Sequence, residues 1–432
     1  RMADDTADSP LYPNRRSDDT DPSSGGVSRR TLLAGSAAAG AAATAGCAGS
    51  APGPGGSDDE SGPQTVYVFN TGDMTVSVID AAADELVTTT FLGATASFPS
   101  NQFLPKRLTG ADDAMWLNVD QGVQAVTAGS LSEAASLETG SGVNFLEVTP
   151  DGEHLVVSAR EPAHKQYRLD ADPSSDSFSE VTAELDRTDE GGRGDNDGPG
   201  PCDVTIHPEA QYAYVPDIFA DKLSVIDYES FEIVNQVSVD PVGGADNVSP
   251  WMGTASWDGD ILLVENNEGD TGTESVWDIS DPTDPEEIAR LTPDDGLGEL
   301  PLTSEIGPDS ETAYVFTPNS EDVTVIDLTA NEVTGRIDLG GKAFVGTWDP
   351  ARTKLYAPVQ TADEVKVIDH AAGEVVETIS VGSKPYGATA GTVRPETDAS
   401  SNLLASLAAI GVEIPGGGTT YCIGECACGH EL

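Results

Sequence analysis

The residues best suited to chemistry lie at the end of the chain. Three cysteines and one histidine fall within nine residues: Cys422, Cys426, Cys428 and His430. Thiolates combined with one imidazole are ligands that Zn²⁺ and Cu⁺ prefer. The same thiols can instead form disulfides, with Cys202 as a further partner, in an oxidising compartment. We therefore expect either a copper or zinc site or disulfides in this segment, and an inert tail is the third alternative.

Two acidic segments are candidates for a hard cation such as Ca²⁺. The first runs from Asp186 to Asp203 and the second from Glu265 to Asp270. Calcium takes several oxygen ligands at once, which clustered carboxylates in a loop can supply. Neither segment has EF-hand spacing, and acidic loops that are simply solvated are the alternative.

Other catalytic groups leave little pattern in the sequence. The chain has no CxxCH haem-attachment motif, so a haem cofactor is not expected. Its five histidines show no Ser-His-Asp arrangement with supporting spacing. We assign no catalytic residue, and the sequence leaves enzymatic activity open while favouring its absence.

A short apolar segment follows two adjacent arginines near the start of the sequence. Arg29 and Arg30 precede an Ala-rich run that ends at Cys47. Twin arginines before a weakly hydrophobic run are typical of a twin-arginine export signal. The small residues before Cys47 are typical of a lipobox, in which the cysteine becomes lipidated. We expect export and a lipid anchor on the outer face of the cytoplasmic membrane, and an uncleaved N-terminal anchor is the alternative.

The charge balance is strongly acidic. The 74 acidic residues outnumber 21 basic ones, which gives a formal net charge of −53. Such a chain repels itself at low salt, and concentrated salt removes that penalty by shortening the Debye length. We expect a protein of a halophilic archaeon; an acid-binding or cation-storing protein is the alternative. Nucleic acid is not an expected partner, because phosphate contacts need clustered Lys and Arg.

Between the export signal and the tail, the sequence contains a repeat of about 40 to 50 residues, which must form the secondary structure that positions the candidate residues. Its clearest copy, 311–327, contains two apolar runs: Tyr-Val-Phe-Thr, and then Val-Thr-Val-Ile-Asp (323–327), in which Val and Ile alternate with a polar residue. This period of two predicts strands with a buried face. The second run, which we call the cassette, occurs seven times in the chain. The copies end at Asp80, Asp227, Asp327 and Asp369, and weaker copies cover 123–128, 165–170 and 275–279.

A second anchor gives the same number of units. In each unit a Pro, or a residue in its place, begins a strand, and a turn follows about seven residues later. The strand starts are Pro105, Val143, Pro201, Pro250, Pro301, Ala343 and Pro385. Seven units of four strands predict an all-β, seven-bladed β-propeller, and a β-sandwich with accidental similarity is the alternative. The first unit, which starts with residues 65–70, has no Pro-led inner strand before it. The last Pro-led strand, 384–395, has no cassette after it. We therefore expect the two segments to pair and complete one blade, which is called velcro closure.

These strands resemble a known group of repeats. The run 65–70 (TVYVFN) and the Val-x-Val-Ile-Asp cassettes are similar to the propeller repeats named for a Tyr-Val-Thr-Asn strand, as in YncE-like proteins. The resemblance covers about 65–395. It implies a secreted or periplasmic propeller; some relatives belong to haem or quinone enzymes, and many have no known activity.

The starts of the innermost strands of a propeller meet around its central channel. Residues just after each predicted start are therefore expected to form a ring at one mouth of the channel. The candidate ligand residues are Lys106, Arg107, Asn144, Asp203, Trp251, Phe344 and Tyr386. Such a mouth suits a small polar or aromatic ligand. The alternative is that these residues only plug the channel and pack the blades.

The sequence therefore divides into five expected segments. They are a disordered region (1–27), an export signal with lipobox (28–47), a flexible tether (48–63), the propeller (64–396) and a tail (397–432) with a short helix near 402–410. We expect a non-catalytic binding or scaffold protein at the cell surface, with the membrane and a surface protein as partners. The alternative is a metal-dependent redox or metal-delivery protein that uses the tail.

Overall fold

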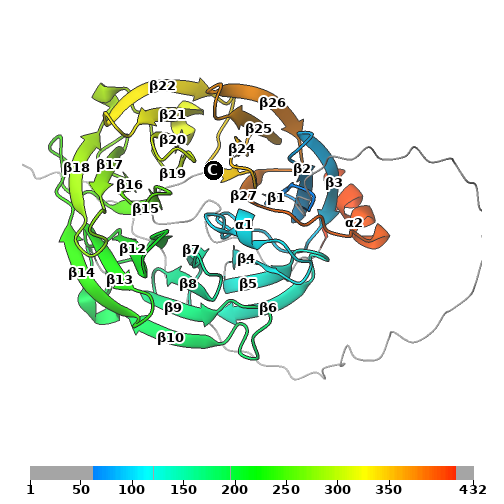
Figure 1. Ribbon diagram of the computed structural model, residues 1–432, viewed down its shortest axis with the longest axis horizontal. Coiled ribbons are helices and arrows are strands. Elements are labelled where there is room, and N and C mark those ends of the chain that lie inside the picture. Colours follow the sequence, from blue (N-terminus) through cyan, green and yellow to red (C-terminus); the bar gives the residue numbers. More distant parts are fainter. Residues whose placement is uncertain (1–61, 120, 195, 415–432) are drawn as a thin grey trace, which may run out of the picture. The chain divides into compact units, whose positions relative to one another are not determined.

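The computed structural model describes residues 62–119, 121–194 and 196–414. Within them, seven antiparallel sheets are arranged in a ring around a central axis (Figure 1). Six sheets have four strands and one has three. The prediction of an all-β, seven-bladed propeller is confirmed.

The blades are numbered along the chain, and their strands are given from the axis outward. Blade 1 contains β27 (Pro385–Gly391), β1 (Thr65–Asn70), β2 (Thr75–Asp80) and β3 (Glu85–Phe91). Blade 2 contains β4 (Ala114–Val119), β5 (Gly122–Thr127) and β6 (Glu133–Glu138). Blade 3 contains β7 (Val143–Val148), β8 (His154–Ala159), β9 (Lys165–Asp170) and β10 (Val181–Asp186). Blade 4 contains β11 (Thr205–Ile206), β12 (Tyr212–Asp217), β13 (Lys222–Asp227) and β14 (Glu232–Ser238).

The remaining blades follow the same plan. Blade 5 contains β15 (Pro250–Ala255), β16 (Ile261–Asn266), β17 (Thr273–Asp278) and β18 (Glu286–Leu291). Blade 6 contains β19 (Thr303–Ile306), β20 (Thr312–Thr317), β21 (Asp322–Asp327) and β22 (Glu332–Asp338). Blade 7 contains β23 (Thr347–Trp348), β24 (Lys354–Val359), β25 (Glu364–Asp369) and β26 (Glu374–Ser380). Helical segments are α1 (Leu104–Arg107), α2 (Ala399–Ala409), η1 (Thr188–Glu190), η2 (Pro293–Asp295) and η3 (Pro318–Ser320).

The seven repeated cassettes form the second strand from the outside of each blade. Where a cassette ends in aspartate, that residue starts the next turn, as in Asp327, whose Oδ1 accepts hydrogen bonds from the backbone N–H groups of Thr329 and Ala330. Second and third strands are buried on both faces because neighbouring blades stack on them. Outer strands such as β14 alternate between exposed and half-buried residues. The apolar core therefore lies between the blades, around the whole ring.

Blade 1 closes the ring from both ends of the propeller. Strand β27 pairs antiparallel with β1, with Thr65 opposite Gly391 and Val68 opposite Ala388. This confirms the predicted velcro closure, in which backbone hydrogen bonds join the two ends and leave neither of these two edges free.

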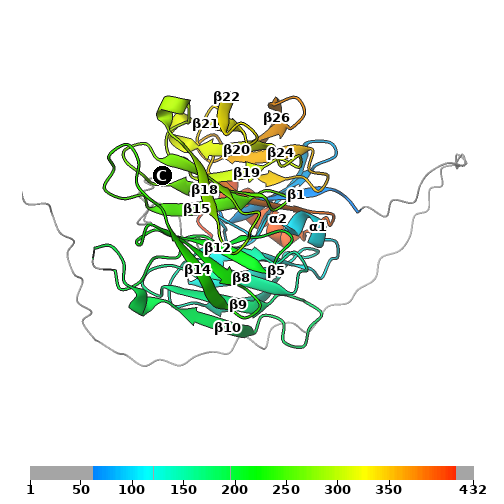
Figure 2. The ribbon, with the colours of Figure 1, turned by 60° about the vertical axis from the view of Figure 1, so that its left-hand side comes forward.

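The C-terminal helix α2 packs against β3, the outer strand of blade 1 (Figures 1 and 2). Asp398 caps its first turn by accepting hydrogen bonds from the backbone N–H groups of Ser400 and Ser401. The helix begins three residues before the expected 402–410. Among the described residues, no helix has the length and apolar character needed to cross a membrane.

One predicted strand is wrong. Pro105 does not begin the inner strand of blade 2; it lies in the first turn of α1, a position where its fixed φ and missing N–H suit a helix. The inner place of blade 2 is taken by the irregular segment 94–100, where Ser100 N–H donates to Trp116 O at 3.0 Å. This segment positions the candidate site.

Candidate functional site

The central channel is filled by the chain itself. We call residues 94–103 the plug; they run along the channel between blade 2 and blade 1 and lead into α1, which lies near the centre of the ring in Figure 1. The plug begins beside the start of β27, where Gly387 N–H donates to Ala96 O. Farther along, Thr389 Oγ1 donates to Ser100 O. Residues 94–100 are all buried.

The plug closes the end of the channel at which the inner strands begin, which we call the start face. Phe98 packs edge-on against Tyr386 with ring centroids 5.6 Å apart, and Tyr386 stacks on Phe344 at 4.8 Å. Trp251 belongs to the same buried cluster. The exposed fraction of each of these side chains is 2% or less. The expected aromatic ring is therefore present, but it is packed around Phe98 and is not open to a ligand.

Asn144 lies beside this cluster and is also buried. Its amide Nδ2 donates to Cys202 O at 2.7 Å and approaches Cys202 Sγ at 3.0 Å. Asp203 lies deeper, between blades 4 and 5, where its carboxylate accepts from the backbone N–H groups of Val204 and Gly253. Five of the seven predicted mouth residues thus line the channel, in packing and hydrogen-bonding roles.

The other two mouth residues were misplaced. Lys106 and Arg107 lie in α1, beyond the plug, at the opposite end of the channel. There Arg107 donates to Pro150 O in the turn that follows the inner strand of blade 3. We call this end the turn face. The prediction for Lys106 and Arg107 is wrong because Pro105 does not begin an inner strand. The plug runs along the channel first, so α1 begins at its opposite end.

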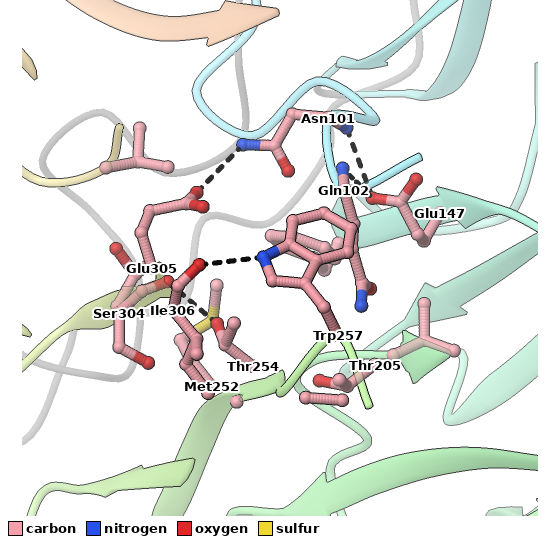
Figure 3. A pocket seen from close by; sticks show the side chains of 16 residues that line it. Asn101, Gln102, Glu147, Thr205, Met252, Thr254, Trp257, Ser304, Glu305 and Ile306 are labelled. Carbon is pink, nitrogen blue, oxygen red and sulfur yellow. Dashed lines mark hydrogen bonds between the residues drawn. The ribbon is translucent and has the colours of Figure 1, made fainter. Parts of the chain in front are cut away.

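Glu147 on β7 holds the plug in place. Its Oε1 accepts from Ser100 Oγ at 2.6 Å. Its Oε2 accepts from the backbone N–H groups of Asn101 and Gln102 at 3.1 and 3.2 Å (Figure 3). Burial raises the pKa of Glu147 to about 7, although these hydrogen bonds oppose the rise. The plug is thus fixed by a carboxyl group whose charge is costly at this depth.

A small cavity of about 30 Å³ remains below the plug. It is lined by Asn101, Glu147, Thr254, Trp257 and Glu305 among others (Figure 3). Asn101 spans it, donating from Nδ2 to Glu305 Oε1 at 3.3 Å and to Gly346 O at 2.9 Å. Burial raises the pKa of Glu305 to about 8. The volume holds about one or two water molecules, which is too little for an organic substrate.

Two further glutamates face each other inside the ring. Glu265 on β16 lies directly opposite Glu274 on β17, and both are fully buried. Neither carboxylate has a partner at good hydrogen-bond geometry among the described residues. The Ser304 hydroxyl, which also lacks such a partner, lies near enough to Glu265 to oppose the rise in its pKa. Burial raises the pKa of Glu265 to about 8 and that of Glu274 well above its usual range, with the charge of Glu265 as a further cause. Like charges opposite each other are unfavourable, so we infer that this pair holds at least one proton at neutral pH.

Three acids of the two acidic segments form ion pairs within the propeller. Glu190 pairs with the buried Arg187, and Glu268 pairs with Arg290 at 2.6 Å. Asp186 pairs with Lys165 at 3.3 Å. In the part of the chain that the structure describes, no group of three or more His, Cys, Asp and Glu side chains is placed to hold a metal ion. The described acids of these loops therefore give no support for calcium; Asp195 lies outside the described residues.

The remaining predicted residues also lie outside the described part of the chain. They are the export and lipidation residues Arg29, Arg30 and Cys47, and the metal candidates Cys422, Cys426, Cys428 and His430. Cys202 is the one cysteine that the structure describes; it is buried and contacts the side-chain amide of Asn144. The sequence-based expectations for the tail and the anchor stay predictions.

Solved structures of other proteins share this fold. A protein from Lactobacillus plantarum matches with a TM-score of 0.60 and 14% identity, over 76% of this chain and 99% of that one. A functionally unknown protein from Desulfotomaculum acetoxidans matches at 0.57 and 13%, over 77% and 100%. The periplasmic gluconolactonase of Pseudomonas aeruginosa matches at 0.56 and 15%, over 76% and 98%. No protein-family model and no curated protein matches the sequence. At these identities the likeness shows the fold alone.

Proposed function

We propose that this chain is a non-catalytic binding or scaffold protein, anchored by a lipid to the outer face of the cytoplasmic membrane of a halophile and related to YncE-like propellers. One observation supports a non-catalytic role: the plug fills the central channel, which is where a propeller would hold a small substrate. The rigid ring still presents many loops, and the outer strands of the six blades that α2 does not contact, to a partner. The partner we propose is another protein of the cell surface.

The support for anchoring comes from the sequence around Arg29, Arg30 and Cys47. In a halophilic host, we expect Cys47→Ser to move the full-length protein from the membrane fraction to the medium, because the lipidated thiol is lost. Changing both arginines to lysine should instead retain it in the cytoplasm. Cell fractionation with immunodetection measures both. A Cys47→Ser protein that stays in the membrane fraction contradicts the lipid anchor.

The tail provides a second candidate function, metal binding for redox chemistry or metal delivery. The observation that favours it is the CxxxCxCxH spacing of Cys422, Cys426, Cys428 and His430. If the tail holds a metal, protein purified natively at high salt contains about one copper or zinc per chain, and changing Cys426 and Cys428 together to Ser removes it. Elemental analysis measures this stoichiometry. Equal metal content in the two proteins contradicts a metal site in the tail.

The partner itself can be sought by crosslinking intact cells and identifying the products by mass spectrometry. The proposal predicts a discrete adduct whose crosslinks map to outer strands or surface loops of the propeller. A protein that purifies without any adduct and hydrolyses a small substrate contradicts it.

A further inference from the structure

Three cations gather at the turn face of the channel. Lys106 and Arg107 come from α1, and Arg352 comes from the turn before β24. None of the three has a carboxylate oxygen within 4.0 Å among the described residues. Nine other Lys and Arg side chains of the described part do pair with carboxylates. In a chain with 74 acids and 21 bases, unpaired cations at one place are unexpected.

Arg352 is held in a fixed position. Its guanidinium lies 3.3 Å from the centre of the Trp257 ring. Trp257 in turn donates from Nε1 to Ile306 O at 2.9 Å and packs edge-on against Phe103, the residue before α1. This contact joins the turn of blade 7, the turn of blade 5 and the plug, so that the guanidinium is pre-oriented at the end of the channel.

The backbone at Arg352 adopts the left-handed conformation, as does Ser310 in the equivalent turn of blade 6. The φ of Arg352 is +56°, in the left-handed region, whereas the corresponding turns of blades 3 and 5 use Gly152 and Gly259 there. A non-glycine residue in this conformation is mildly unfavourable relative to glycine. The arginine is thus placed at a turn position where glycine would be easier.

The positive charges of Lys106 and Arg352 repel each other. The positive charge of Arg352 is the main cause that lowers the pKa of Lys106. The carboxyl group that acts on Arg352 from below is Glu305, in the cavity under Trp257. Glu305 forms no ion pair within 4.0 Å with either cation, and burial raises the pKa of its carboxyl group, which favours the neutral form. A pair of like charges held together without a counter-charge favours an anion.

We propose that Lys106 and Arg352 form a binding site for a compact, doubly charged oxyanion, with phosphate or sulfate as the chemical class and Arg107 at its flank. The planar guanidinium offers paired N–H donors to two oxygens, and the ammonium adds a point charge. The net charge of −53 repels anions at low salt. At molar salt the Debye length falls to about 3 Å, so the distant carboxylates are screened. The affinity for the oxyanion then depends on the two nearby cations, Lys106 and Arg352. The site does not depend on the proposed cell-surface role.

The source of the oxyanion can be free or a group on a larger molecule, such as a phosphomonoester or a sulfate ester. Calorimetric titration of the full chain in 2 M KCl at pH 7 tests inorganic phosphate, inorganic sulfate and acetate in parallel arms, followed by a phenyl phosphate arm. We expect saturable binding of phosphate or sulfate at one site per chain and none of acetate. Tighter binding of phenyl phosphate than of phosphate identifies a group on a larger molecule as the better ligand.

Two variants decide whether these residues form the site. Lys106→Gln removes one charge, and Arg352→Gly removes the other at a turn position that suits glycine, so folding is preserved. Each is expected to weaken oxyanion binding at least tenfold. Lys342→Gln is the matched control, because Lys342 is a half-buried lysine without a carboxylate partner among the described residues, and its Nζ donates to Asn319 Oδ1. This variant should leave binding unchanged. Absence of saturable binding by phosphate and sulfate, or equal affinity in Arg352→Gly, overturns the proposal.

Discussion

Phe98→Ala is expected to lower the free energy of unfolding of the propeller by about 3–5 kcal/mol. Phe98 is 2% exposed and contacts Phe145 and Tyr386, at ring-centroid distances of 5.7 and 5.6 Å. Removing its ring leaves a void at the start face that the surrounding inner strands cannot close, because each is fixed by its own blade. Urea unfolding in 2 M KCl, followed by circular dichroism, measures the change.

The matched control for this variant is Val234→Ala. Val234 lies on the outer strand β14 and is 47% exposed, so its truncation should cost less than about 1 kcal/mol. If Phe98→Ala costs no more than this control, Phe98 does not close the channel and the account of the start face is wrong.

The stability of the propeller is expected to fall as the pH rises from 6.5 to 9. Burial raises the pKa of Glu147 and Asp203 to about 7, and that of Glu265 and Glu305 to about 8. The unfolded chain titrates these groups near 4, so in this window the folded state binds more protons than the unfolded state. The free energy of unfolding therefore decreases with pH until the carboxyl groups are ionised, by a total on the order of several kcal/mol.

The pH range starts at 6.5 because two buried histidines have the opposite effect on stability at lower pH. Burial lowers the pKa of His164 and His207, so their contribution to stability is lost as the pH falls below about 6.5. Between pH 6.5 and 9 the buried carboxyl groups determine the sign. Urea unfolding at constant salt across this range measures the slope.

Glu265→Gln tests which group contributes to the slope. The amide cannot ionise, and it can donate to Glu274 while accepting from Ser304, both of which lack partners. We expect the variant to be more stable than the parent protein at pH 9, by about 1–3 kcal/mol, and to show a flatter pH dependence. Stability that rises with pH in the parent, or an unchanged slope in the variant, contradicts the buried-pair account.

The fold followed from local signals in the sequence. The alternation in 323–327 and its copies predicts strands wherever the chain is read, and the spacing of the copies predicts their number. Closure by β27 and β1 followed from an incomplete unit at each end. These features are visible because each depends on residues close together in the sequence.

The site depended on contacts that the sequence does not show. Pro105 is compatible with the start of a strand and with the first turn of a helix, and the structure has the helix. The plug has no apolar period, so nothing marked 94–103 as a buried segment. The sequence places Glu265 in an acidic segment that is either a calcium candidate or simply solvated, and it assigns Glu274 to no site, because alternation does not reveal which polar positions face a neighbouring blade. Arg352 and Trp257 meet only because two turns converge at the turn face.

Hydrogen–deuterium exchange across 94–103 at high salt tests the central claim most directly, that the chain itself fills the channel. The amides of Phe98, Ser100, Asn101 and Gln102 donate to Asn118 Oδ1, Trp116 O and the Glu147 carboxylate. The account predicts that these amides exchange as slowly as those of the core strand β27. Exchange of the plug at the rate of an exposed loop would show an open channel, and a small-molecule site in the propeller would then replace the scaffold role.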